Sequence, residues 1–205
     1  MAQVTHGLRA ILSHPRVYST FQNLLGAKGF REEFVRNQVR PIAKMKILDI
    51  GCGPADVLEH MDEVEYWGFD TSDAYITHAK ATLGDKGKFF CKELQVSDLQ
   101  DMPSFDVVLA MGLLHHLDDD VAQNLISLAA QALHPGGRLL TFDPCFEPGQ
   151  SFLARYLIQR DRGQNVRSRQ GYEALIQPTF DSYKITVRHR SWIPYTHCFM
   201  ECTKT

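Results

Sequence analysis

The sequence has no excess of charge of either sign. Its 205 residues carry 22 lysines and arginines against 24 acidic residues, which gives a formal net charge of −2. A nucleic-acid-binding protein usually carries a basic footprint, so the overall charge does not point to a nucleic-acid partner. No apolar run is long enough to span a membrane, and residues 1–12 mix polar with apolar side chains where a secretory signal would be apolar. Insertion into a membrane is therefore not expected.

The cysteines lack the pattern of a disulfide framework or of a metal site. Their number is odd, they are widely spaced, and no two of them form a Cys-x-x-Cys pair; they stand at positions 52, 91, 145, 198 and 202. Disulfide scaffolds and zinc sites both depend on paired spacings. The pattern predicts free thiols, no bound metal and a reducing, cytoplasmic location.

Apolar and charged side chains are present in ordinary amounts, 44% and 22% of the residues. A chain of this length and composition can bury one hydrophobic core, so a single domain over 1–205 is expected. Short apolar runs alternate with longer amphipathic ones, which is typical of a parallel sheet with helical crossovers. The predicted strands are 46–50, 65–69, 88–91, 105–110 and 138–142.

Helices are predicted between these strands, and a hairpin after them. The helices cover about 54–62, 73–83 and 119–133, and the second of them begins at a capping Thr71 or Ser72. Near the C-terminus, 182–190 and 196–203 alternate in polarity and are separated by a turn. This pattern predicts an antiparallel hairpin.

One glycine-rich loop carries the first indication of a ligand. In KILDIGCGPADVLEHM (46–61), a strand that contains Asp49 is followed by Gly51 and Gly53, where a ligand can lie against the backbone. A dinucleotide loop would need a third glycine at position 56, but this chain has Asp56, whose charge repels a phosphate. The loop therefore favours a nucleoside that carries a positive charge.

Four segments together resemble the Rossmann-like S-adenosylmethionine-dependent methyltransferases, and the resemblance runs from Lys46 onward. In chain order they are LDIGCGPAD (48–56), GFDTS (68–72), FDVVLAMGLLHHLDD (105–119) and LHPGGRLLTFD (133–143). The resemblance implies an α/β fold with a seven-stranded, mostly parallel sheet of order 3-2-1-4-5-7-6 and a C-terminal antiparallel hairpin. It divides the chain into an N-terminal helical lid (1–45), a cofactor-binding core (46–143), a substrate-side insertion (144–172), and a final helix and hairpin (173–205).

The same resemblance implies S-adenosylmethionine as cofactor and a set of residues that bind it. Asp70 is expected to accept hydrogen bonds from both ribose hydroxyls, since a carboxylate offers two acceptors and no donor. After the third strand many relatives have Gly-Asp, whereas this chain has Lys92 and Glu93. Either Glu93 or Asp98 is then the acceptor for the adenine amino group. The expected cofactor-binding residues are Asp49, Gly51, Cys52, Gly53, Asp70, Thr71, Glu93, Leu94 and Met111.

Two adjacent histidines are candidates for a general base. His115 and His116 follow the fourth predicted strand, where the sheet of relatives opens toward the methyl group. Imidazole titrates near neutral pH and suits proton removal from an acceptor. The alternative is a structural role in this turn, because the same pair recurs in relatives with different substrates.

The acceptor pocket is expected in the parts that the fold does not share. The helix candidates 17–26 and 30–39, joined across Gly26 and Gly29, form the lid, in which Tyr18 and Phe21 either contact a ligand or pack in the protein. The insertion contains an arginine cluster, which is either a solvated basic face or a site for an anionic group; Arg160 and Arg162 are its candidate ligands, and the other members are Arg155, Arg167 and Arg169.

The sequence thus predicts methyl transfer from S-adenosylmethionine to a small-molecule acceptor, including an anionic one. An RNA or protein acceptor is one alternative, although the segment 111–114 is Met-Gly-Leu-Leu where amino-methylating nucleic-acid enzymes have Asn/Asp-Pro-Pro-Tyr. A protein that binds the cofactor as a sensor or partner subunit without turnover is the other.

Overall fold

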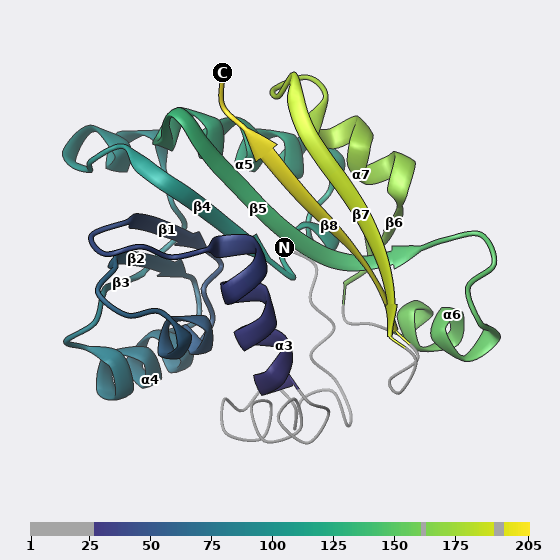
Figure 1. Cartoon of the computed structure of the whole chain (residues 1–205), viewed down its shortest axis with the longest axis horizontal. Helices are drawn as coiled ribbons and strands as arrows, with labels where there is room; N and C mark the ends of the chain where they lie inside the picture. Colours follow the sequence, from purple (N-terminus) through teal and green to yellow (C-terminus); the bar gives the residue numbers. More distant parts are fainter. Residues whose placement is uncertain (1–26, 161–162, 191–194) are drawn as a thin grey trace. The chain divides into compact units, whose positions relative to one another are not determined.

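The computed structural model describes residues 27–160, 163–190 and 195–205 (Figure 1). The helix predicted for 17–26 lies outside this part of the chain, as do Tyr18, Phe21 and Arg162. Within it, no helix is long and apolar enough to cross a membrane. The described residues fall into two compact units, which we call the N-terminal unit (27–109) and the C-terminal unit (110–205).

The sheet of the N-terminal unit is parallel. Its central strand, β1 (Lys46–Ile50), pairs with β2 (Glu65–Asp70) on one side and with β4 (Phe105–Met111) on the other, and β3 (Lys88–Cys91) pairs with β2. β1 is buried from Ile47 to Ile50, as is usual for strands covered on both faces, although this stretch includes the carboxyl group of Asp49. The predictions for 46–50 and 88–91 are confirmed at both ends, and β2 and β4 each extend one residue beyond the predicted range.

The crossover from β2 to β3 is the helix α4 (Asp73–Leu83), with the predicted bounds. Ser72, rather than Thr71, is its cap: the Ser72 hydroxyl accepts a hydrogen bond from the backbone N–H of Tyr75 at 3.4 Å. The buried residues of α4, Ile76, Ala79 and Leu83, recur at helical spacing and form its inner face.

Two helix predictions in this unit are wrong in detail. In place of a helix over 54–62 the chain forms a short 3-10 helix, η2 (Asp56–His60). The reason is a turn that precedes it, in which the N–H of Ala55 bonds to the carbonyl of Cys52 at 2.9 Å and Ala55 adopts a left-handed φ of 59°. Gly29 lies inside α3 (Ala27–Phe34), which continues as a π-helix, η1 (Val35–Val39), and not in a joint between two helices.

The C-terminal unit has an antiparallel sheet with helices packed on it. The strand β8 (Tyr195–Thr203) pairs with β5 (Leu133–Phe146) and with β7 (Ser182–Arg190), which confirms the predicted hairpin. The helices α5 (Asp119–Ala132) and α7 (Arg169–Ile176) contact each other and the strands of this sheet. The insertion contributes α6 (Phe152–Gln159) and a two-residue strand, β6 (Arg167–Ser168), that pairs with β5.

The strand β5 is much longer than the predicted 138–142. The segment Pro135–Gly137 has the composition of a turn, because proline and two glycines stand together. Instead it extends the sheet: the N–H of Gly136 bonds to the carbonyl of Lys204 at 2.7 Å, and the N–H of Lys204 bonds to the carbonyl of Gly137 at 2.9 Å. The pairing partner is distant in the sequence, so local composition does not reveal it.

The hydrogen-bonded strand order is β3-β2-β1-β4-β5-β8-β7, with β6 beside β5 as an additional strand. Apart from β6, this is the predicted seven-stranded order, and the Rossmann-like α/β fold is confirmed. The chain leaves β1 toward β2 and β3, and then returns to the other side of β1 with β4. In open α/β sheets, ligands bind outside the carboxyl ends of the strands at such a reversal.

Gly68 in β2 offers a test of this packing. A Cβ on Gly68 would lie 2.9 Å from Cys52 Sγ, 3.0 Å from the ring of Tyr66 and 3.2 Å from that of Phe89. We expect Gly68→Ala to lower the free energy of unfolding by about 1–3 kcal/mol, the usual cost of overpacking. Urea unfolding at neutral pH measures it.

Gly29→Ala is the matched control for Gly68→Ala. A Cβ on Gly29 meets no described residue within 4 Å, so the free energy of unfolding of the variant should rise by about 0.5–1 kcal/mol from alanine's helix propensity. Equal effects of the two substitutions would contradict the tight packing around Gly68.

Candidate functional site

Asp49 lies in β1, just before the glycine loop, and is fully buried. Tyr66 Oη donates a hydrogen bond to Asp49 Oδ2 at 2.6 Å, while Asp49 Oδ1 has no hydrogen-bond partner among the described residues. Burial raises the pKa of Asp49 from 3.8 to about 7; the bond from Tyr66 opposes this shift, and the charge of Asp70 adds to it. The loop therefore begins with a carboxyl group that retains an unused acceptor atom.

The glycine loop is fixed to the neighbouring strand by its backbone. The N–H groups of Gly51 and Cys52 both donate to the carbonyl of Phe69, at 2.8 and 3.0 Å. Gly51 and Gly53 have left-handed φ values of 72° and 55°, which favour glycine. A Cβ built on Gly53 meets no residue of the described ranges within 4 Å, so these residues leave room for a ligand at this point.

Cys52 stands between the two glycines and is buried. Burial, together with the nearby carboxylates of Asp49 and Asp70, raises the pKa of its thiol far above the usual range. Because the thiolate is the reactive form of cysteine, this side chain does not act as a nucleophile.

Asp70 connects the end of β2 to this loop. Its Oδ2 accepts a hydrogen bond from the N–H of Gly53 at 2.9 Å, and its Oδ1 accepts one from the N–H of Ser72 at 2.8 Å. Each carboxylate oxygen has a second lone pair, so both can still accept a bond from a hydroxyl group. Thr71, next in the chain, is exposed.

The two acids after β3 differ in their contacts. Asp98 accepts bonds from the Lys92 ammonium group and from the N–H of Gln95, and both lower its pKa. Glu93 is exposed, and its side chain has no bond to another residue in the described ranges; Leu94 beside it is buried. Of the two candidates, Glu93 is the one not engaged by neighbouring residues.

Asp56, counted above as a charge that repels phosphate, forms an ion pair. Its Oδ2 lies 2.7 Å from a guanidinium nitrogen of Arg31 in α3. The pair offsets the charge of Asp56, so the argument against a dinucleotide now depends on the missing third glycine alone.

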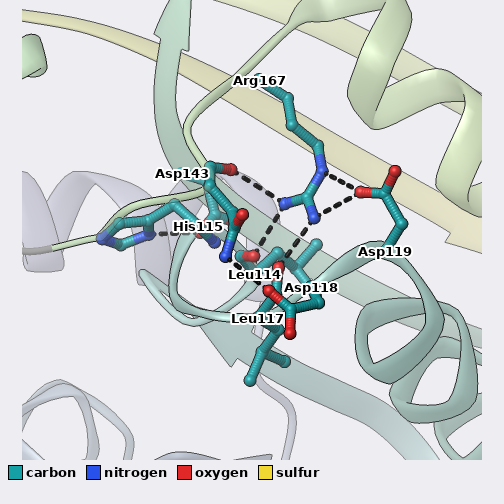
Figure 2. Close-up of polar contacts among 8 residues, drawn as sticks. Leu114, His115, Leu117, Asp118, Asp119, Asp143 and Arg167 are labelled. Atoms are coloured by element: carbon teal, nitrogen blue, oxygen red, sulfur yellow. Dashed lines mark hydrogen bonds and ion pairs between the residues drawn. The ribbon is translucent and has the colours of Figure 1, made fainter. Parts of the chain in front are cut away.

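A second site lies in the C-terminal unit, in the turn that follows β4 (Figure 2). This turn contains the 3-10 helix η4 (Leu114–His116). His115 is joined twice to one oxygen of Asp143 in β5: its ring Nδ1 lies 2.7 Å from Oδ1, and its backbone N–H donates to the same atom at 3.1 Å. The His115 side chain is 7% exposed and that of Asp143 1%, so the pair is nearly removed from water.

The carboxylate of Asp143 has further capacity to accept hydrogen bonds. Its Oδ2 is buried and has no hydrogen-bond partner among the described residues. Burial raises the pKa of Asp143, while the bonds from His115 and the charge of Arg167 act in the opposite direction. His116, the other candidate base, contacts the His115 ring with 4.0 Å between the centroids.

Sequence reasoning singled out His115 but missed Asp143. A signal was present, because Asp143 ends the apolar run of β5, the strand next to β4 in the sheet. Acidic residues at the ends of neighbouring strands are candidate partners for a base. In the described part of the chain, no three histidine, cysteine, aspartate or glutamate side chains gather in a way that could hold a metal ion.

The arginines of the insertion have different partners. Arg155 lies over the ring of Phe146 and Arg160 over that of Tyr156, with 5.4 and 4.4 Å to the ring centroids. Arg167 bonds to Asp119 and to backbone carbonyls around η4. Arg167 is thus committed to the protein, while Arg160 is exposed on α6.

Comparison with known families is consistent with this geometry. The family model described as a methyltransferase domain matches residues 48–139, the segment from the glycine loop to β5. This segment is thus similar to that family. The predicted resemblance is confirmed, and the domain is of the S-adenosylmethionine-dependent class.

Individual proteins that carry the name methyltransferase are also similar to this chain. The chain is 29% identical over 111 residues to a ubiquinone biosynthesis O-methyltransferase of Idiomarina loihiensis, covering 52% of this chain and 45% of that protein. It is 33% identical over 120 residues to the 27-O-demethylrifamycin SV methyltransferase of Amycolatopsis mediterranei, covering 53% and 42%. The aligned segment thus spans less than half of the length of either relative.

Among solved structures, the fold resembles that of the S-adenosylmethionine-dependent methyltransferase SibL. The TM-score is 0.69 at 16% identity, over 97% of this chain and 60% of that one. The likeness extends beyond residues 48–139, so described elements outside the matched segment share this fold as well.

Asp49 gives the methyltransferase domain a testable pH dependence. The folded protein keeps the Asp49 proton up to about pH 7, whereas the unfolded chain loses it near 3.8. Protonated Asp49 therefore contributes to the free energy of unfolding. This contribution is complete below pH 3.8 and is lost as the pH rises to about 7. In Asp49→Asn this loss is absent. The free energy of unfolding of the variant should therefore rise relative to that of the wild type by on the order of 4 kcal/mol across that range.

Chemical unfolding of both proteins between pH 4.5 and 8 measures this difference. Tyr66→Phe is the companion variant: it removes a bond that lowers the pKa of Asp49, so its loss of stability should continue to higher pH. Parallel stability curves for the wild type and Asp49→Asn would show that Asp49 is ionised throughout.

Proposed function

We propose that this protein transfers the methyl group of S-adenosylmethionine to a hydroxyl group of a small molecule. The observation that carries this proposal is the buried His115–Asp143 pair, because an alcohol or phenol must lose a proton when its oxygen is methylated. The similarity to an O-methyltransferase of ubiquinone biosynthesis and to a methyltransferase of 27-O-demethylrifamycin SV supports the same class of acceptor.

The residues of the glycine loop fit the cofactor. In our proposal Gly51, Cys52 and Gly53 lie under its methionine and ribose parts, where the open face of Gly53 leaves room. The unused oxygen of Asp49 leaves an acceptor near a cationic ligand, and a nearby positive charge favours the ionised form of this carboxyl group. Asp70 and Thr71 bind the ribose, Glu93 accepts from the adenine amino group, Leu94 forms an apolar wall, and Met111 at the end of β4 faces the sulfonium.

The cofactor supplies the activated methyl group, and the protein's own chemical step is the removal of a proton. When bound, S-adenosylmethionine supplies a methyl group on a positively charged sulfur, which leaves as a neutral thioether. His115 takes the proton of the acceptor hydroxyl on Nε2, since its Nδ1–H donates to Asp143. Asp143 fixes this tautomer and stabilises the imidazolium that forms.

Positioning of the acceptor and general-base catalysis differ in how much they lower the barrier. Holding the acceptor in line with the methyl group supplies about 7–11 kcal/mol. A general base adds on the order of 100- to 10,000-fold in rate, or about 3–5 kcal/mol. Positioning therefore dominates, and removal of His115 should slow the enzyme without abolishing turnover.

An anionic group on the acceptor is a further part of the proposal. Arg160 is exposed at the end of α6, with its guanidinium over the ring of Tyr156. An arginine held over an aromatic ring still presents N–H donors at its edge to a carboxylate. Arg160 therefore supports the choice of acids among the acceptors to be screened.

The cofactor is tested first, by calorimetric titration with S-adenosylmethionine, S-adenosylhomocysteine and NAD. We expect binding of the first two and none of the third. Asp70→Ala should weaken the binding of S-adenosylmethionine by about 1.5–3 kcal/mol, the usual contribution of a hydrogen bond to a charged group. Asp73→Asn, an exposed acid at the start of α4, is the control, and equal effects of the two would remove Asp70 from the cofactor site.

The acceptor is tested by screening phenols and alcohols, amines of the same skeleton, and RNA, with product identified by mass spectrometry. Methyl ethers are the expected products. Methylation of RNA or protein alone would overturn the proposal. Cofactor binding without any turnover would instead support the role of a sensor or partner subunit.

The base is tested by comparing His115→Ala with His116→Ala. We expect the first to lower kcat about 100- to 10,000-fold, with little change in cofactor affinity, and the second to have a smaller effect. The rate of His115→Ala should recover as the pH approaches the pKa of the acceptor, since an ionised acceptor needs no base. Loss of cofactor affinity in both variants would instead indicate a structural role for the turn, and His134→Ala, a half-buried histidine of β5, is the control.

A further inference from the structure

Arg167 reaches the His115 turn from a distant part of the chain and uses its whole guanidinium group there. Nη1 donates to the carbonyls of Leu114 and Asn165, both at 2.9 Å, and Nη2 donates to the carbonyl of Leu117 at 2.7 Å. Nε and Nη2 also donate to Asp119 Oδ1, at 2.9 and 2.6 Å. A guanidinium has five N–H groups, and these five bonds account for all of them.

The two carbonyls on the turn stand on either side of the histidines. Leu114 precedes His115, and Leu117 follows His116, so Arg167 joins both ends of η4 (Figure 2). In Figure 2 one edge of the guanidinium faces Asp119, and dashed lines run from its two terminal nitrogens to Leu114 and Leu117 on the turn. A planar, forked cation can make this set of bonds, whereas lysine carries a point charge with three donors.

The segment around Arg167 also touches His115 directly. The N–H of Asn165 donates to the carbonyl of His115 at 3.0 Å. Gly163 lies so close that a Cβ there would fall 2.0 Å from His115 Cδ2 and 2.6 Å from the carbonyl oxygen of His115. The backbone of His115 and one edge of its ring are thus both held by the segment 163–167.

The same segment is joined to the strand that carries Asp143. Arg167 and Ser168 form β6 and pair with Cys145 and Phe146 of β5, just after Asp143. Arg167 therefore connects the turn that bears His115 with the strand that bears its carboxylate partner.

The burial of the Arg167 side chain distinguishes it from an arginine that only forms a surface ion pair. The Arg167 side chain is 10% exposed, but that of Asp119 is 74% exposed, and ion pairs in water contribute little. The bonds to the carbonyls are partly buried, whereas those to Asp119 are exposed, so the former are the ones that fix the path of the turn.

We propose that Arg167 is a positioning residue that holds His115 in the orientation in which it bonds to Asp143 and receives a proton. This inference rests on the proposed function, in which His115 is the base. It assigns Arg167 to the catalytic turn and removes it from the candidate ligands of an anionic acceptor.

The first test needs no acceptor. In protein with 15N-labelled histidine, the Nδ1–H proton of His115 should give a resonance, identified by its absence in His115→Gln. We expect this resonance to shift or broaden beyond detection in Arg167→Lys and to stay unchanged in Arg188→Lys, an exposed arginine of β7. An unchanged resonance in Arg167→Lys would overturn the proposal, whatever the protein methylates.

The second test uses turnover and a double variant. Arg167→Lys should lower kcat about 10- to 100-fold, part of the contribution of a base, with less than a twofold change in cofactor affinity or acceptor KM. The loss should shrink at high pH, as for His115→Ala. Because Arg167 acts through His115, the double variant should be no slower than His115→Ala alone.

An anion-binding role predicts the opposite pattern. It would raise acceptor KM in Arg167→Lys and give additive losses in the double variant, and either result would overturn the proposal. Should Arg167→Lys fold poorly, Gly163→Ala displaces the His115 ring from its other side and should produce the same loss of resonance and of kcat.

Discussion

A single oxygen of Asp143 accepts two hydrogen bonds from one residue, and much of the C-terminal unit is arranged around that contact. Taking a carboxylate out of water is expensive unless it is hydrogen-bonded and paired. His115 supplies a ring N–H and a backbone N–H to the same atom, and the Arg167 charge adds to their effect. The turn after β4 must then follow one path, since a shift of His115 would leave a buried acceptor without a donor. The carbonyls that this path turns outward are those to which Arg167 bonds.

Asp49 in the N-terminal unit repeats the same arrangement with a different partner. Both acids lie in central strands, both are buried, and each has one oxygen bonded to a ring-bearing side chain, Tyr66 or His115. In each carboxyl group the other oxygen has no hydrogen-bond partner among the described residues. Buried acceptors are rarely left in this state, and where they are, a ligand or a bound water commonly completes them. The described residues thus include two unused, buried carboxyl oxygens, one just before the glycine loop and one beside His115.

Sequence patterns predicted the parts of this molecule whose causes are local. β1 and β3 are short apolar runs bounded by polar residues, so their ends are visible in the sequence. The range predicted for β5 was too short because Pro135 and two glycines indicate a turn. The carbonyl that pairs with Gly136 belongs to Lys204, far along the chain. Arg167 was grouped with its neighbours for the same reason: its partners lie about fifty residues earlier, and no local spacing links them.

The carboxyl groups of Asp49 and Asp70 also affect the reactivity of Cys52 in the glycine loop. A methyl donor that lies over a cysteine endangers the protein that binds it, because a thiolate is a far better nucleophile than an alcohol. Burial and the charges of Asp49 and Asp70 keep the Cys52 sulfur protonated. Under the proposed function, the negative charge that attracts a sulfonium also protects the loop from being alkylated by its own cofactor.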